Sequence, residues 1–264
     1  MIPNYAVWGL IFVIAFVMAM TGRGGGNFYV PVLIATGFTM HAAATAAQFV
    51  LFCSAVSALL IFEKGKAVDW KLALVIDPPT DVMAFVGGYY AHAFSGGLLK
   101  FVFALLLVMA GLLMLYPFPE RSGIQRPRFG LWRREFGGHN YVVNLWLAIP
   151  ITALTGLMAG MVGISGGSFK IPLMVLACGV PMRVAVGTSS AMVAVTALMG
   201  FCGHAAAGDF DPHWVVPLIL AAVLGGLIGG KVSLKTRPKQ LKRVFAWTTL
   251  AAAVFMFANV FLSG

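Results

Sequence analysis

The sequence predicts an all-α integral membrane protein made of two copies of one five-segment unit, with the second copy inverted relative to the first. Three observations predict this fold: an apolar composition, a glycine-rich motif that occurs twice, and opposite charge in equivalent loops. Of the 264 residues, 60% are hydrophobic and 10% are charged, whereas soluble domains carry about 25% charged residues. Apolar stretches longer than about 18 residues recur along the chain, and each could span a bilayer.

The N-terminal stretch up to Met20 is apolar but lacks a preceding basic region and a small-residue cleavage site. We therefore expect a first membrane helix rather than a removed signal peptide. The net charge of +10 fits cationic loops on anionic lipid, and nothing resembles a nucleic-acid-binding module, so no nucleic-acid partner is expected. Cys53, Cys178 and Cys202 lie singly in apolar segments. That spacing predicts neither a disulfide nor a metal site, and we expect no cofactor.

The clearest internal repeat pairs Gly22–Pro31 with Gly163–Pro172. Three further pairs follow in the same order, namely Gly37 and Met40 with Gly179 and Met182, Pro79 and Gly87-Gly88 with Pro217 and Gly225-Gly226, and Leu99–Ala104 with Leu241–Ala246. Four matches in one order indicate a duplication. We expect a first repeat over 1–116, a basic cytoplasmic linker over 117–144, and a second repeat over 145–264.

Each repeat reads as a long helix, a glycine break, a short apolar piece and three longer helices, about ten segments in all. In the first repeat we expect them near 4–21, 27–37, 41–62, 72–93 and 98–116. In the second repeat we expect them near 145–162, 168–179, 182–205, 213–230 and 240–262.

Charge predicts the orientation of these segments. Most of the 18 Lys and Arg fall in three clusters: Lys64, Lys66 and Lys71; Arg121, Arg126, Arg128, Arg133 and Arg134; and Lys231, Lys235, Arg237, Lys239, Lys242 and Arg243. The positive-inside rule places these loops in the cytoplasm. The loops equivalent to the first and third clusters carry no Lys or Arg, as expected if the two repeats are inverted. Both termini should then lie outside the plasma (inner) membrane, and inverted repeats are typical of secondary transporters.

The short pieces after the glycine breaks are too short to span a membrane. Pieces of about 11 or 12 residues reach roughly 16–18 Å, against a hydrocarbon core of about 30 Å. Irregular backbone is tolerated at membrane depth only where protein or a water-filled cavity satisfies it. We therefore expect each glycine run to dip inward and to open a half-helix whose N-terminus faces the protein interior.

A helix N-terminus offers free N–H groups and a partial positive charge, which favour an anion. The two breaks therefore predict substrate-binding residues, which are Arg23, Gly24, Gly25, Gly26 and Asn27 in the first and Ser165, Gly166, Gly167 and Ser168 in the second. Arg23 adds a guanidinium suited to oxyanions. The competing interpretation is that the glycines only permit close helix packing and that Arg23 anchors at the headgroups.

Two further groups of polar residues lie in the predicted membrane segments. Hydroxyls and an amide that could complete an oxyanion cage are Thr45, Gln48, Thr188, Ser189 and Ser190; ordinary interhelical hydrogen bonding is the alternative. Asp77 and Asp81, one helical turn apart, are candidates for proton coupling. Alternatively, Asp77 only caps a helix that begins at Pro78.

The paired motifs, together with Gly65–Trp70 and Gly208–Asp211, resemble the TauE/SafE family over roughly 8–116 and 147–262. The resemblance implies a permease for sulfite, taurine-derived sulfonates or related small sulfur anions. The family's Gly-Gly-Gly core is intact at Gly24–Gly26 but reads Ser165-Gly166-Gly167 in the second copy. Arg23 and Lys170 are not positions that the family pattern makes basic, so they could tune this chain toward a more charged anion.

We therefore expect a secondary transporter of a small sulfur-containing anion, such as sulfite, sulfoacetate or a taurine-derived compound, that works by alternating access in the lipid bilayer. Another small organic or inorganic anion is the first alternative. An integral-membrane enzyme is a second, although the sequence offers no convincing nucleophile–base pair or metal cluster. A membrane scaffold or sensor is a third, and it gives no reason for duplicated breaks. A homo-oligomer is also compatible with the sequence.

Overall fold

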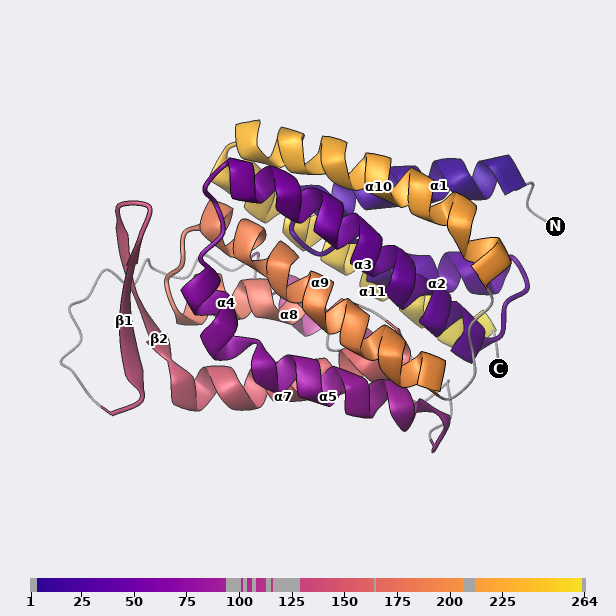
Figure 1. The fold of residues 1–264 in the computed structure, drawn as a ribbon, viewed down its shortest axis with the longest axis horizontal. Coiled ribbons are helices and arrows are strands. Elements are labelled where there is room, and N and C mark those ends of the chain that lie inside the picture. The colour runs from indigo at the N-terminus through magenta and orange to yellow at the C-terminus, as the bar shows by residue number, and fades with distance from the viewer. Residues whose placement is uncertain are drawn as a thin grey trace.

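The computed structural model describes residues 4–93, 101, 104–105, 108–112, 115, 129–163, 165–206 and 212–262. Nearly all described elements are helices, and a single two-stranded hairpin completes them (Figure 1). The first half contains α1 (Asn4–Met20), α2 (Gly26–Ala35), α3 (Met40–Lys64), α4 (Trp70–Ile76), α5 (Pro78–Tyr89) and the 3₁₀ turn η1 (Ala91–Ala93). The second half contains α7 (Leu145–Val162), α8 (Gly167–Pro172), the π turn η2 (Leu173–Ala177), α9 (Met182–Ala206), α10 (Pro212–Lys235) and α11 (Pro238–Leu262).

Four helical stretches are long and apolar enough to cross a membrane: 41–64, 145–162, 182–206 and 215–235. Three shorter apolar helices, over 5–20, 26–35 and 167–177, accompany them among the described residues. The last two are the short pieces expected after the glycine breaks. The segment expected at 98–116 lies largely outside the described residues, as do residues 117–128 of the expected linker.

The helix expected over 72–93 is divided. Helix α4 ends at Ile76 and α5 begins at Pro78, with Asp77 between them. Proline favours the first position of a helix, because its missing N–H would have no partner there. Asp77 thus occupies the capping position, but its side chain makes no capping hydrogen bond.

One helix of each half, α5 or α10, packs against two long helices of the other half. Helix α10 lies against α1 and α3, and α5 lies against α7 and α9. The duplicated glycine pairs lie at these contacts. A methyl group added at Gly87 would lie 2.2 Å from the Leu157 carbonyl oxygen of α7. One added at Gly225 would lie 2.6 Å from the Phe12 carbonyl oxygen of α1. The glycines therefore allow close backbone approach between the two halves.

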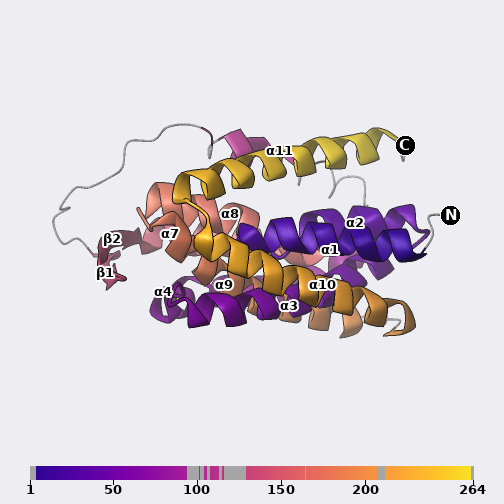
Figure 2. The same ribbon diagram turned by 90° about the horizontal axis from the view of Figure 1, so that it is seen from above.

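An antiparallel hairpin stands at one end of the helical bundle (Figures 1 and 2). Strand β1 (Leu131–Phe136) pairs with β2 (His139–Asn144) through a turn at Gly137-Gly138, where both residues have positive φ. Two glycines with positive φ match the twist of a two-residue hairpin. The hairpin lies within residues 117–144, which the sequence predicts only as a basic cytoplasmic linker.

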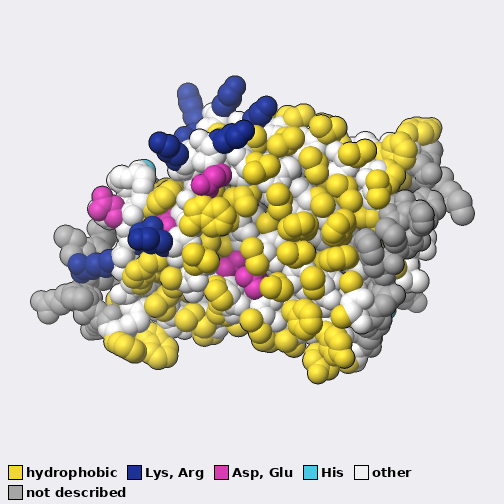
Figure 3. All heavy atoms as spheres, in the orientation of Figure 1, with side chains coloured by type: hydrophobic (Ala, Val, Ile, Leu, Met, Phe, Trp, Pro, Cys, Tyr) yellow, Lys and Arg dark blue, Asp and Glu magenta, His cyan; other side chains and the backbone are white. Residues whose placement is uncertain are grey.

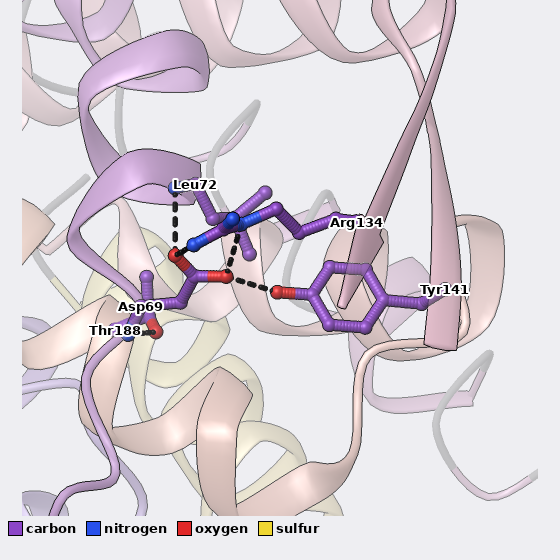
Figure 4. A network of polar contacts seen from close by, with 5 residues as sticks. All are labelled: Asp69, Leu72, Arg134, Tyr141 and Thr188. Atoms are coloured by element: carbon purple, nitrogen blue, oxygen red, sulfur yellow. Dashed lines mark hydrogen bonds and ion pairs between the residues drawn. The ribbon is translucent and has the colours of Figure 1, made fainter. Parts of the chain in front are cut away.

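The hairpin is tied to the helices through Asp69, which precedes α4 (Figure 4). The Arg134 guanidinium donates to both Asp69 carboxylate oxygens, at 2.8 and 2.9 Å, and the Tyr141 hydroxyl donates to the same carboxylate. The Asp69 carboxylate also accepts a hydrogen bond from the Leu72 N–H at 3.2 Å, and the Asp69 N–H donates to the Thr188 hydroxyl of α9 at 2.9 Å. Asp69 therefore connects the hairpin, α4 and α9.

The molecular surface separates charge from apolar side chains. In Figure 3 the Lys and Arg side chains gather toward the end that carries the hairpin, and most of the remaining visible face is hydrophobic. The exposed apolar side chains of the molecule include Leu60, Val82, Leu220 and Leu224, each more than half exposed. A belt of this kind suits lipid chains rather than water.

Candidate functional site

Each glycine break reverses the chain between a long helix and a short one. After α1, Gly24 and Gly25 adopt φ values of 70° and 104°, which side chains other than glycine rarely tolerate, and α2 begins at Gly26. After α7, Gly163 adopts φ 75°, and a continuous helical segment runs from Gly167 to Ala177. Figures 1 and 2 show α2 extending toward the N-terminal end of the molecule and α8 toward the hairpin.

The two breaks meet inside the protein. The Asn27 side-chain amide donates a hydrogen bond to the Ser168 hydroxyl at 2.8 Å, so the first turns of α2 and α8 are in direct contact. A methyl group added at Gly167 would lie 3.2 Å from the Cα atom of Arg23. The Ser189 hydroxyl of α9 donates to the Gly22 carbonyl oxygen at 2.9 Å and closes this meeting point from a third element.

Polar groups at this meeting point have unused hydrogen-bonding capacity. Neither α2 nor α8 has a side-chain cap, and the first N–H groups of a helix have no partner within it. The Ser165 hydroxyl and the Asn27 carbonyl oxygen have no hydrogen-bond partner among the described residues, although these residues are only 2% and 1% exposed. Buried polar atoms are normally paired, so the Ser165 hydroxyl is available to donate to an anion, whereas the Asn27 side-chain oxygen can only accept a hydrogen bond.

Arg23 is fully buried, and its side chain extends from the first break toward α11. Its guanidinium donates to the hydroxyls of Thr21, Thr248 and Thr249, and it lies 4.3 Å from the centre of the Phe245 ring. Among the described residues no carboxylate forms an ion pair with it. With no exposed surface, Arg23 is not placed as a headgroup anchor. A buried cation without a carboxylate leaves a positive charge that a bound anion could balance.

Lys170, in the last turn of the short helix α8, is also buried. Its ammonium forms an ion pair with Asp77 and donates to the Thr196 hydroxyl at 2.8 Å. The Thr196 hydroxyl in turn donates to the Asp81 carboxylate at 2.8 Å. The two carboxylates noted in the sequence are thus joined to the second glycine break through a lysine.

The other predicted ligands lie apart from the meeting point or are engaged elsewhere. The hydroxyls of Thr45 and Ser190 donate to carbonyl oxygens of their own helices. The Thr188 hydroxyl accepts from the Asp69 N–H, and the Gln48 amide donates to the Ala159 carbonyl oxygen of α7 at 3.1 Å. The contacts of Thr188 and Gln48 join different segments, as the alternative to an oxyanion cage expects, whereas those of Thr45 and Ser190 stay within one helix.

Two features of the site were missed by sequence reasoning. The pairing of Lys170 with Asp77 was not foreseen, although a lysine inside an apolar helix needs a counter-ion and Asp77 stands in an apolar segment. The contact of Thr248 and Thr249 with Arg23 could not be read from a single chain, because it joins residues more than two hundred positions apart. No group of three His, Cys, Asp or Glu suited to a metal ion occurs within the described ranges.

Comparisons with known proteins give consistent results. The family described as "Sulfite exporter TauE/SafE" matches residues 7–256. A probable membrane transporter protein, YunE, of Bacillus subtilis is 24% identical over 235 residues, covering 84% of this chain and 86% of its own. A probable membrane transporter protein of Xylella fastidiosa strain 9a5c is 26% identical over 248 residues, covering 92% of this chain and 90% of its own. No solved structure matches significantly.

Proposed function

The chain belongs to the TauE/SafE family of membrane transporters, and on that premise we propose that it carries a small sulfur-containing oxyanion by alternating access. The observation that carries this proposal is the hydrogen bond between Asn27 and Ser168. Through it the N-terminal turns of α2 and α8, two positive helix ends, come together in the protein interior. Such a pairing costs electrostatic energy unless an anion is bound there.

The charges near the breaks support an oxyanion. Arg23 has no carboxylate partner within the described part of the chain, and the Lys170 ammonium of α8 would lie 3.7 Å from a methyl group added at Gly166. A sulfite or sulfonate group has several acceptor oxygens, which suit the unpaired Ser165 hydroxyl and the free N–H groups of the half-helices. The sulfur chemistry itself rests on the family description, and the contacts at the breaks support an anion as the ligand.

The packing of the two halves supports an inverted pair. Because α5 contacts α7 and α9 as α10 contacts α1 and α3, exchanging the halves leaves the pattern of contacts unchanged. This exchange is the symmetry expected of two related repeats around a central site, of which an inverted pair is one kind. In the proposed cycle, one repeat rocks against the other and opens the meeting point of the breaks to each side of the membrane in turn.

Flux into proteoliposomes tests this function. Vesicles containing the purified protein should take up at least one of radiolabelled sulfite, sulfoacetate and taurine with saturable kinetics, and unlabelled anion on the other side should accelerate exchange. Protein-free vesicles prepared in parallel are the control for leakage. The absence of saturable flux for all three compounds would contradict the proposal.

A further inference from the structure

The buried cluster of Lys170, Asp77, Thr196 and Asp81 is more than a packing detail. Lys170 of α8 forms an ion pair with Asp77, at the junction of α4 and α5. Thr196 of α9 lies between Lys170 and the second carboxylate, Asp81 of α5. Lys170 and Asp77 are 1% and 4% exposed. Removing charges from water to this degree is costly, and apolar side chains of similar size would fill the space at lower cost.

The cluster lies beside the proposed anion site. The Lys170 N–H donates to the Gly166 carbonyl oxygen at 3.1 Å, one turn back along the helix. A methyl group added at Gly166 would lie 3.7 Å from the Lys170 ammonium nitrogen. The unpartnered Ser165 hydroxyl immediately precedes Gly166. An anion held at Ser165–Ser168 would therefore be close to the ammonium that Asp77 now holds.

The charges facing Asp77 are few. Within the described residues they are Lys170 from α8 and Asp81 from its own helix. Helix α9 contributes the uncharged Thr196, and the Thr80 N–H of α5 donates to the Asp77 backbone carbonyl oxygen at 2.7 Å. If an anion takes the Lys170 ammonium, Asp77 has no other cation near it, and Asp81 repels its negative charge.

We propose that the transported anion and the Asp77 carboxylate compete for the Lys170 ammonium, so that anion binding is coupled to uptake of a proton by Asp77. Binding transfers the ammonium from Asp77 to the anion, and the carboxylate released takes one proton from water. Release of the anion reverses both events. The proton taken up by Asp77 offsets one negative charge of the incoming anion, which favours this exchange in a buried site. The inference rests on the proposed function and adds its coupling ion.

The sign of the pH dependence follows from competition. At low pH Asp77 is protonated and leaves Lys170 to the anion, so binding is tight. At high pH the ionised Asp77 competes, so the anion binds more weakly. Linkage of one proton to one anion predicts that affinity falls about tenfold for each pH unit in the range where Asp77 is ionised in the free protein and protonated in the complex.

Binding of radiolabelled sulfoacetate between pH 6 and 9 tests the coupling, because both acid groups of this probe stay ionised there. The wild type should lose affinity about tenfold per pH unit. Asp77→Asn should bind with an affinity that changes less than about twofold over the range, since no competitor remains. Asp81→Asn is the matched control inside the cluster: the same change one turn away should keep the tenfold slope and move it toward lower pH.

A control variant and a measurement of proton uptake complete the test of the coupling. Glu135→Gln, which removes an exposed carboxylate of the hairpin, should reproduce the wild-type curve. In weakly buffered solution the wild type should take up about one proton per sulfoacetate bound, and Asp77→Asn none. The proton measurement on the wild type does not depend on any variant folding correctly.

The possible outcomes separate the two proposals. Wild-type affinity that is independent of pH, or a tenfold slope that survives in Asp77→Asn, would overturn the coupling while leaving anion transport intact. If the wild type neither binds nor transports sulfoacetate, sulfite or taurine, the proposed function fails, and the coupling fails with it.

Discussion

Asn27 joins the two halves of the molecule through a single hydrogen bond to Ser168, and it stands at the start of a half-helix with no side-chain cap. Its position makes it the most sensitive probe of charge at the meeting point of the breaks. An amide there presents hydrogen-bond donors to an anion at no cost in charge. A carboxylate of nearly the same size would present negative charge instead.

Asn27→Asp should lower anion affinity by at least about a hundredfold, because a like charge at a binding site costs several kcal/mol and each 1.4 kcal/mol is about tenfold. Equilibrium binding of the labelled anion measures the effect. Asn140→Asp makes the same chemical change on the exposed hairpin and should leave binding unchanged. Equal affinities of the Asn27→Asp variant and the wild type would place the anion elsewhere.

At the residue scale, the sequence could predict those features that depend only on neighbouring residues in the chain. Glycine runs that need positive φ, and small polar residues at helix starts, follow from local rules, and α2 and α8 begin at Gly26 and Gly167, close to the expected positions. The partners of Arg23 and Lys170 depend on tertiary contacts between distant helices. No spacing rule within one chain gives those contacts. The binding roles of the predicted residues remain predictions.

At the scale of elements, glycine governs how the helices approach one another. Gly87 of α5 faces α7, and its counterpart Gly225 of α10 faces α1. An added methyl group at either position would fall well inside normal contact with backbone atoms of the neighbouring helix. Both helices would have to move apart to accommodate it.

Gly87→Ala and Gly225→Ala should each destabilise the protein by about 1–3 kcal/mol, the usual cost of overpacking. Thermal unfolding in detergent measures this. Gly9→Ala is the matched control, since Gly9 lies in α1 with nothing within 4 Å of an added methyl group. The control should unfold at or slightly above the wild-type temperature, because alanine is the better helix former. Unchanged stability in the Gly87 and Gly225 variants would argue against close packing at these positions.

The hairpin is held by the Asp69 carboxylate. Burial alone would raise the pKa of this carboxyl, but hydrogen bonds from Arg134, Tyr141 and the Leu72 N–H outweigh it and place the pKa below its ordinary value. A carboxyl whose pKa is lowered on folding stabilises the folded state above its unfolded-state pKa of about 3.9. That stabilisation is lost as the pH falls through the lower, folded-state pKa.

Asp69→Asn should therefore weaken hairpin docking by about 2 kcal/mol at neutral pH, which is the typical contribution of a hydrogen bond to a charged group. Hydrogen exchange of the 131–144 amides measures the docking. The difference from the wild type should be constant between pH 5 and 8 and shrink only in acid, below about pH 4. Glu135→Gln should leave exchange unchanged, and equal protection in Asp69→Asn and the wild type would contradict the role of Asp69.

Boundaries of helices and strands could be predicted where a single sequence signal, such as a glycine run, is not opposed by another. The division at Asp77-Pro78 was foreseen only as the alternative of a helix starting at Pro78, because the apolar run continues through it. The hairpin was missed although its signs are present. Residues 131–136 and 139–144 flank Gly137-Gly138, a dipeptide suited to a two-residue turn. The high charge of this stretch led us to interpret it as a loop.

For the molecule as a whole, composition and duplication were enough to predict a helical membrane protein with two related halves. The family match and the apolar helices confirm the membrane class. The inversion and the location of the termini remain predictions, since they depend on charge bias. The gathering of Lys and Arg toward the hairpin end (Figure 3) agrees with one cytoplasmic face.

Cysteine labelling tests this orientation in a background where Cys53, Cys178 and Cys202 are replaced. With a membrane-impermeant maleimide, Ser263→Cys should be labelled in intact cells, because the C-terminus is predicted to lie outside. Asn140→Cys in the hairpin should react only after the membrane is opened. Labelling of both positions from the same side would contradict the predicted topology.

The central claim is that a small oxyanion binds where the two glycine breaks meet. Selenite, the heavier analogue of sulfite, allows a direct test by anomalous diffraction at the selenium edge from crystals of the wild-type protein grown with this anion. We expect an anomalous peak between the first turns of α2 and α8, within contact of Asn27 and Ser168. Selenium bound only at other positions, or no peak at the meeting point at saturating selenite, would contradict it.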